Sequence, residues 1–230
     1  MTSRDFVPAL IIVDVQEDFC PPKGSLAVPN GRSIAEPINS LLAEPKFALR
    51  IATQDWHPAN HISFANNHNP PKQPFTDSIK ISNPLNPSEE PYTTRLWPVH
   101  CVQDTAGAAL IPELDTSNID VVVKKGQDSR VEMYSAFYDP FRQPTVSDSG
   151  LADTLKERGI THVYVVGLAY DYCVKATAVD AAKEGFVVYV VQDGTKAVGG
   201  NEAWEECTKS LEADGVKVVR MEDEEVQRLR

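Results

Sequence analysis

Short apolar runs that alternate with amphipathic segments are the feature that most constrains this chain. Residues 9–15 have the sequence ALIIVDV, a nearly continuous apolar run that is typical of a strand buried on both faces of a parallel sheet. Further strands are expected at 47–53, 121–123, 162–166, 186–191 and 216–219, and helices at 33–42, 151–158, 174–184 and 202–213. Strands that alternate with helices form parallel βαβ units. The sequence therefore predicts a three-layer α/β/α fold around a six-stranded, mainly parallel open sheet.

The segment 56–112 interrupts this alternation. It contains nine of the seventeen prolines and four of the five histidines, with little periodicity. A loop of this length within a compact domain usually has a function. We therefore expect a single domain over residues 1–230, in which 56–112 is an excursion that carries metal-site and pocket residues rather than a linker between domains.

Net charge and hydropathy limit the classes of partner that the protein can bind and the compartments in which it is expected. The 22 basic and 33 acidic residues leave a net charge of −11, which argues against nucleic acid or an anionic membrane as a partner. No run approaches the roughly 18 apolar residues that span a bilayer. The first residues lack the pattern of a secretory signal, and the last ones lack the S-K-L peroxisomal signal. We expect a cytoplasmic protein, with the nucleus as a second location, whose four cysteines are reduced.

Three residues near strand ends are candidates for one active site, because ligands of open α/β sheets bind beyond the carboxyl ends of the strands. Asp14 lies inside the first apolar run, where burial raises the pKa of a carboxyl group toward that of a general base. Cys173 lies near an expected helix N-terminus, where the helix dipole favours a thiolate. Lys125 follows the third strand, and its ammonium group would stabilise both negative charges.

Each of these residues also has a simpler interpretation. Asp14 is then a helix cap or an ion-pair partner, and Cys173 is a small residue that packs the first turn of a helix. Lys125 and its neighbour Lys124 are then part of a solvated rim. The presence of all three residues at the ends of different strands favours catalysis.

A second candidate group is a metal site. Asp55 and His57 form a D-x-H pair after the second strand, and residues i and i+2 of an extended segment point the same way. With His100 as a third ligand, the set suits Zn²⁺ or Fe²⁺ with open positions. His61 is a further candidate, as a fourth ligand or a supporting partner, and His68 a weaker one. The alternative is that these histidines only decorate a polar loop.

The segments that carry these residues resemble the nicotinamidases of the isochorismatase-like cysteine hydrolase family. They are IIVDVQEDFCPPKGSLAVPNG, TQDWHPANHISFA, LWPVHCVQDT, VKKGQDSRVEMYSAF and VVGLAYDYCVKATAVDAA. The pieces D-W-H-P and W-P-x-H-C are the nicotinamidase-like part of the match. The excursion over 66–94 is long and rich in Pro and Asn, which resembles the fungal form of the family.

The resemblance implies an isochorismatase-like hydrolase fold and a catalytic triad. Cys173 would be the nucleophile, Asp14 would exchange its proton, and Lys125 would hold the charges in place. The backbone N–H groups of Ala169 and Cys173 would form the oxyanion hole, helped by a cis peptide bond between Leu168 and Ala169.

The resemblance also implies how the substrate is held. One divalent metal ion, usually zinc, would coordinate the pyridine nitrogen of nicotinamide. Its ligands would be Asp55, His57 and His100. Phe19 and Trp97 would flank the ring, with Tyr134 near the pocket.

The expected reaction is the hydrolysis of nicotinamide to nicotinate and ammonia in NAD salvage, through a thioester on Cys173. One alternative is a related cysteine amidohydrolase that acts on another small amide, such as a pyrazine or carbamoyl compound. A vinyl-ether hydrolase of the isochorismatase type is less favoured, because that chemistry needs no cysteine. The other alternative is a non-catalytic binding protein of the same fold. The sequence leaves open whether the chain forms a homo-oligomer.

Overall fold

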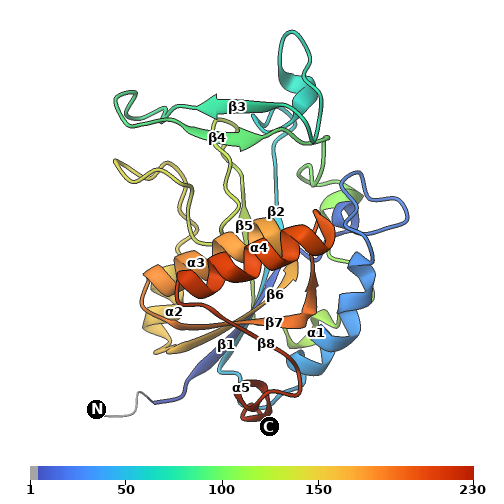
Figure 1. Cartoon of the computed structure of the whole chain (residues 1–230), viewed down its shortest axis with the longest axis vertical. Coiled ribbons are helices and arrows are strands. Elements are labelled where there is room, and N and C mark those ends of the chain that lie inside the picture. The colour runs from blue at the N-terminus through green and yellow to red at the C-terminus, as the bar shows by residue number, and fades with distance from the viewer. Residues whose placement is uncertain (1–4) are drawn as a thin grey trace.

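The computed structural model describes residues 5–230 and contains the expected six-stranded sheet (Figure 1). The strand order is β5-β2-β1-β6-β7-β8, and every neighbouring pair is parallel. The strands are β1 (Pro8–Val13), β2 (Leu49–Asp55), β5 (Val121–Lys125), β6 (His162–Leu168), β7 (Val187–Lys196) and β8 (Lys217–Val219). All six residues of β1 are buried, as its continuous apolar run predicts.

Helices cover both faces of the sheet, which gives the three expected layers (Figure 1). Helices α1 (Ala35–Leu42) and α5 (Glu224–Gln227) contribute to one apolar core. Helices α2 (Leu151–Glu157), α3 (Lys175–Lys183) and α4 (Gly200–Ala213) contribute to the core on the other face. Helix α5 was not expected from the sequence, because its four residues are too few to show a helical period. No helix within residues 5–230 is both long and apolar enough to cross a membrane.

The connections place a crevice beside β1. The chain builds β2 and then β5 on one side of β1, and then crosses over to build β6 and β7 on the other side. Ile11 accordingly pairs with Ile51 of β2 and with Val165 of β6. Because the order of the strands reverses at this point, the carboxyl ends of β1 and β6 border the place where open α/β sheets bind ligands.

The excursion contains structure that the sequence did not reveal. Strands β3 (Ser78–Ile81) and β4 (Tyr92–Arg95) pair antiparallel and lie beyond the carboxyl ends of β2 and β5 (Figure 1). The turn between them is tied to a later loop, since Asn83 Nδ2 donates to Glu89 Oε2 at 2.6 Å and to the carbonyl of Pro144 at 2.8 Å. Four-residue strands among prolines carry too little alternation to be recognised.

Single helical turns complete the chain. A π-helical turn over Tyr170–Val174 leads directly into α3. The 3₁₀ turns are Glu17–Phe19, Gly31–Ile34, Ala65–Asn67, Ala106–Ala108 and Thr116–Asn118. The expected helix at 33–42 is thus a 3₁₀ turn followed by α1, and the expected strand at 186–191 extends to Lys196.

Gly167 allows β6 to pass close to β1. Its φ is +112°, and a Cβ at this position would lie 2.0 Å from the carbonyl oxygen of Val13. The pairing of β6 with β7 also shifts register between Val165 and Gly167. Only glycine fits both the backbone angle and the space, at the end of the strand that leads to the site.

We expect Gly167→Ala to lower the free energy of unfolding by about 3 kcal/mol or more, because the new methyl group overlaps backbone atoms that cannot move aside. Urea denaturation measures this loss. The control is Gly159→Ala, which also has a positive φ, +65°, but has open space around the added carbon. It should lose only about 1 to 2 kcal/mol. Equal losses in the two variants would contradict this explanation.

Candidate active site

The three catalytic candidates meet at the carboxyl ends of β1, β5 and β6. The ammonium nitrogen of Lys125 lies 2.9 Å from Asp14 Oδ2 and 3.6 Å from Cys173 Sγ. It also contacts Asp55 Oδ1 at 2.5 Å and donates to the carbonyl of Met133 at 3.2 Å. Lys125 is therefore a buried cation whose partners are two carboxylates, a carbonyl and a sulfur atom. The solvated-rim interpretation of this lysine is wrong.

Asp14 is turned toward the site by the residues around it. It directly follows β1 and has a φ of +49°. The hydroxyl of Thr53, on the adjacent strand β2, donates to Asp14 Oδ1 at 2.6 Å, and the backbone N–H of Asp14 donates to the same hydroxyl at 3.1 Å. The carboxylate is thus held on one oxygen by Thr53 and on the other by Lys125.

Burial sets the protonation of the Asp14–Cys173 pair. Burial raises the pKa of the Asp14 carboxyl to about 6, although Lys125 opposes the shift. Burial also raises the pKa of the Cys173 thiol well above its usual range, again against Lys125, and the neighbouring carboxyl group of Asp14 raises it further. The expected thiolate in the resting protein is therefore corrected to a thiol, because desolvation outweighs the helix terminus. Asp14 is the base next to it.

Asp55 joins this group to the candidate metal ligands. Its Oδ1 faces Lys125, while its Oδ2 lies 3.5 Å from His57 Nε2 and 4.0 Å from His100 Nε2. Burial alone would raise the pKa of Asp55, but Lys125 and the imidazole of His57 outweigh it and lower this pKa below its usual range. The carboxylate is therefore ionised and available to a cation.

The donor atoms of this group fit a divalent metal ion. A backbone carbonyl only accepts, so the rings of His57 and His100 each donate through Nδ1, to Gly126 at 2.8 Å and to Pro98 at 2.7 Å. Their Nε2 lone pairs then converge on Asp55. Nε2 of His57 is buried and has no hydrogen-bond partner within residues 5–230. Burial, followed by the nearby His57, lowers the pKa of His100 to about 4, so this ring is a neutral ligand at pH 7.

The other two histidines of the excursion differ in position. His61 is buried, and its ring centroid lies 4.0 Å from that of His57. Together with His57 and Glu132 it forms a second group of converging donor atoms. His68 belongs to neither group, because its Nε2 contacts the carbonyl of Ile62 at 2.8 Å.

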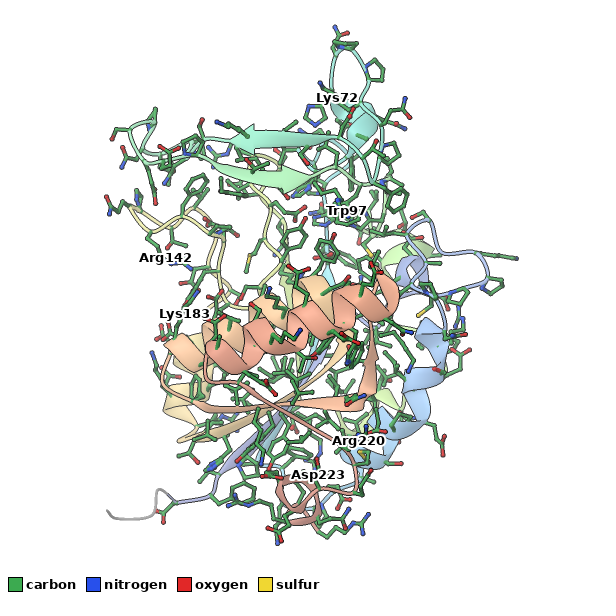
Figure 2. The ribbon with its side chains drawn as sticks, in the orientation of Figure 1. Lys72, Trp97, Arg142, Lys183, Arg220 and Asp223 are labelled. Carbon is green, nitrogen blue, oxygen red and sulfur yellow. The ribbon has the colours of Figure 1, made fainter. Side chains whose placement is uncertain are left out.

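A cavity of about 400 Å³ that is partly open to solvent connects the two groups. The expected pocket residues Phe19, Trp97 and Tyr134 all line it, and Trp97 Nε1 donates to the hydroxyl of Tyr134 at 2.9 Å. In Figure 2, Trp97 lies between the β3–β4 strands and the main body of the protein. Five further residues line the cavity without a sequence pattern that predicts this position, and they are Leu26, Val28, Glu132, Tyr172 and Val198.

The expected oxyanion-hole residues lie at the same cavity. Ala169 and Cys173 both line it, and the peptide bond between Leu168 and Ala169 is cis, as the resemblance implied. The helical turn that carries Cys173 starts at Tyr170, immediately after Ala169. The role of these two backbone N–H groups stays a prediction.

The parallel sheet and the buried cysteine, lysine and aspartate define the hydrolase class to which the chain belongs. The sequence model of the isochorismatase domain matches residues 8–223, and the protein is a member of this family.

Relatives with known activities cover nearly the whole chain. A nicotinamidase of Acinetobacter baylyi is 44% identical over 209 residues, which are 91% of this chain and 90% of that protein. The structure of yeast nicotinamidase bound to the inhibitor nicotinaldehyde has a TM-score of 0.86 at 35% identity, and the match covers 93% of this chain and 100% of that one. A pyrazinamidase of Pyrococcus horikoshii in complex with zinc has a TM-score of 0.70 at 34% identity and covers 93% and 98%.

These comparisons favour nicotinamidases over the alternatives of another small amide or a non-catalytic protein. They do not confirm a fungal-type member, because the bacterial relative is more identical in sequence than the yeast one.

We expect His57→Ala to lose most of its bound divalent metal, because the variant lacks a nitrogen donor that faces Asp55. Metal content after exhaustive dialysis, measured by mass spectrometry, tests this. His68→Ala removes an imidazole from the same excursion but outside the donor groups, and should keep its metal. Equal metal content in the two variants would mean that the ligand set is wrong.

Proposed function

We propose that this protein is a nicotinamidase, which hydrolyses nicotinamide to nicotinate and ammonia. The observation that carries the proposal is the shared carboxylate of Asp55. One oxygen contacts Lys125 of the triad and the other faces two histidine nitrogens, all beside one small cavity. A thiol and a metal group that does not bind this thiol are the two parts needed to hold a ring and attack its carboxamide. The relatives named nicotinamidases support the same activity.

The first half of the reaction forms a thioester. Asp14 takes the proton of Cys173, and Lys125 stabilises the resulting thiolate, whose sulfur lies 3.6 Å from its ammonium group. The sulfur attacks the carbonyl carbon of the amide, and the backbone N–H groups of Ala169 and Cys173 donate to the oxyanion that forms. Asp14 then gives its proton to the departing nitrogen, the C–N bond breaks and ammonia leaves.

The second half releases the acid. Asp14, again unprotonated, takes a proton from water, and the hydroxide oxygen adds to the thioester carbon. The C–S bond breaks, the thiol regains its proton from Asp14, and the acid gives its remaining proton to solvent and leaves as nicotinate. Because one carboxyl group serves as base and acid in turn, a pKa of about 6 is well suited to work near neutral pH.

Asp55, His57 and His100 would hold the metal ion, which we propose to be zinc. When bound, this Lewis acid supplies a coordination position for the ring nitrogen of the substrate. Phe19 and Trp97 flank the ring, and Tyr134 holds Trp97 in place through its hydroxyl. These contacts orient the carboxamide toward Cys173, which lowers the entropy cost of the attack.

The finer expectations from the sequence are also part of this proposal. We place the reaction in NAD salvage and the protein in the cytoplasm. The high TM-score with the yeast enzyme over nearly the whole chain supports a fungal-type member, although sequence identity does not.

We expect Cys173→Ala to abolish ammonia release from nicotinamide while the fold and the metal content stay unchanged, because Cys173 contacts Lys125 and is not a member of the donor group Asp55, His57 and His100. Coupled ammonia assays, circular dichroism and metal analysis test the three parts. In the wild type, nicotinaldehyde should form a thiohemiacetal with the sulfur atom, and the variant should form none. Residual turnover above about one part in a thousand would remove the nucleophile assignment.

The dependence of kcat/KM on pH should follow the titration of the Asp14 carboxyl group. Its pKa is raised, so the base form is present above about pH 6 and is lost as the pH falls through this value. We expect kcat/KM to fall about tenfold per pH unit below pH 6. The bond from the Thr53 hydroxyl lowers this pKa, so Thr53→Val should move the midpoint to higher pH. Metal content is measured at each pH, so that a loss of activity through loss of the metal can be distinguished from the titration of Asp14. A flat profile down to pH 5 would contradict the assignment.

A further inference from the structure

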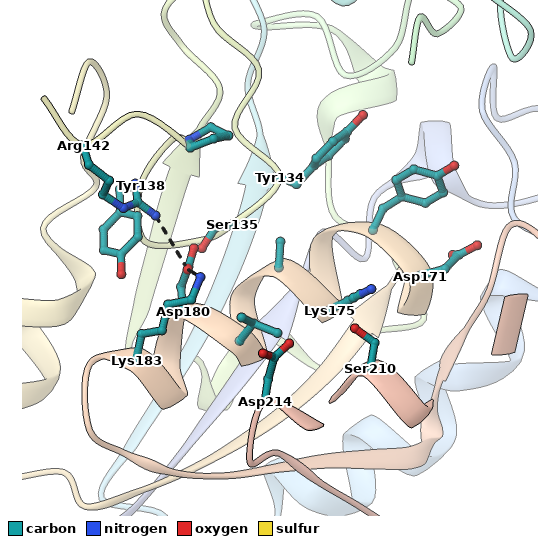
Figure 3. Close-up of a pocket in the computed structure, with 14 residues that line it drawn as sticks. Tyr134, Ser135, Tyr138, Arg142, Asp171, Lys175, Asp180, Lys183, Ser210 and Asp214 are labelled. Atoms are coloured by element: carbon teal, nitrogen blue, oxygen red, sulfur yellow. Dashed lines mark hydrogen bonds and ion pairs between the residues drawn. The ribbon is translucent and has the colours of Figure 1, made fainter. Parts of the chain in front are cut away.

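Tyr172 lies where the active-site cavity meets two outer grooves. Its side chain lines the 400 Å³ cavity next to Cys173, and it also lines two open grooves of about 1170 and 800 Å³. Figure 3 shows the larger groove, with Tyr134 at one end and Lys175 and Asp171 on the helical segment that follows β6. The half-buried ring of Tyr172 is thus part of the wall between the reacting sulfur and the outside.

Residues of the excursion hold the ring of Tyr172 in place. Arg95, at the end of β4, donates from Nη1 to the Tyr172 hydroxyl at 2.9 Å. The ring also packs edge-on against Trp97, at 4.9 Å between centroids, and lies 5.6 Å from the ring of Tyr134. Trp97 and Tyr134 are themselves hydrogen-bonded. The bond from Arg95 is therefore the polar contact that joins β4 to the helical turn carrying the nucleophile.

The charges on the two sides of Tyr172 differ. The cavity side holds the carboxyl groups of Asp55 and Glu132. The outer side holds Arg95 and Lys175, which line the 800 Å³ groove. Within residues 5–230 neither of these two cations has a carboxylate at ion-pair distance. Two carboxylates, Asp171 and Glu206, line the same groove, and the oxygens of Asp171 accept from the backbone N–H groups of Val198 and Gly199.

We propose that Tyr172 is the gate of the active-site cavity, that Arg95 latches it shut, and that Arg95 and Lys175 draw the anionic product outward when it opens. The outward pull rests on the proposed function, in which a neutral amide enters and a carboxylate leaves. An anion is attracted by the two cations outside, whereas a neutral amide is affected little by them. The hydrogen bond from Arg95 that holds Tyr172 in place follows from the contacts of Tyr172 alone and does not depend on the proposed function.

Alkylation of Cys173 measures the opening of this gate without using the enzyme's own reaction. Iodoacetamide is small and neutral, and peptide mass spectrometry separates Cys173 from the other cysteines, which are buried. Tyr172→Phe keeps the ring and removes only the acceptor oxygen, and Arg95→Gln removes the guanidinium donor and leaves a shorter side chain. Each should speed alkylation of Cys173 about three- to tenfold, the range for loss of one hydrogen bond, and the double variant should be no faster than either one.

Iodoacetate, the anionic counterpart, measures the outward pull. The ratio of the iodoacetate rate to the iodoacetamide rate should fall about two- to fivefold in Arg95→Gln and in Lys175→Gln, because each removes a cation from the outer side. Tyr172→Phe opens the latch without changing a charge, so its ratio should stay that of the wild type. High salt should remove the differences in ratio but not the effect of the latch.

Lys80→Gln is the matched control, since it removes one exposed cation from β3, the partner strand of β4, away from Tyr172. It should leave both rates unchanged. Wild-type alkylation rates in Tyr172→Phe or Arg95→Gln would overturn the latch, and unchanged ratios in Arg95→Gln and Lys175→Gln would overturn the pull on anions. Failure of the proposed function would show differently, as absent ammonia release from nicotinamide by the wild type while the alkylation rates still respond to the two latch variants.

Discussion

The buried ammonium group of Lys125 is the interaction on which the rest of the site depends. A cation with no solvent exposure is stable only if opposite charges and acceptors surround it, and removing one partner from such a group typically costs about 3 to 5 kcal/mol. Here the partners are Asp14 from β1, Asp55 from β2 and a backbone carbonyl from the loop after β5. The charge requirement therefore fixes three neighbouring strands relative to one another, and the same requirement explains why two acidic side chains are tolerated in the interior.

The sheet could be predicted from the sequence because its strands are locally recognisable. The apolar run of β1 and the β-branched run of β5 need no partner to be seen, and alternation with helices implies parallel pairing. The order of the strands then brings Asp14 and Lys125 to one edge. The same reasoning found Asp55 and His57, since a D-x-H pair after a strand is a local pattern.

Residues whose role comes from long-range contacts were missed. Glu132 and Tyr172 have no distinctive local pattern, and they face the cavity because the loop after β5 and the turn after β6 approach each other in space. The β3–β4 pair was missed for the same reason, because its strands are held by contacts with distant loops such as that of Asn83 with Pro144. The protonation of Cys173 was also misjudged, since the helix terminus is visible in the sequence whereas the depth of burial is not.

The dipeptide Lys125–Gly126 gives the site a fixed spacing. Lys125 belongs to the triad, while the carbonyl of Gly126 accepts from His57 Nδ1, and a Cβ on Gly126 would lie 2.4 Å from the His57 ring. With Asp55 bridging the same two halves, neither half can shift without the other. In the proposed reaction such a site selects substrates by distance, because it fixes the separation between the ring atom held by Asp55, His57 and His100 and the carboxamide at Cys173. Isomers that carry the same groups at other positions of the ring are then rejected by length rather than by polarity. New substrates are more easily reached by exchanging ring atoms than by moving substituents.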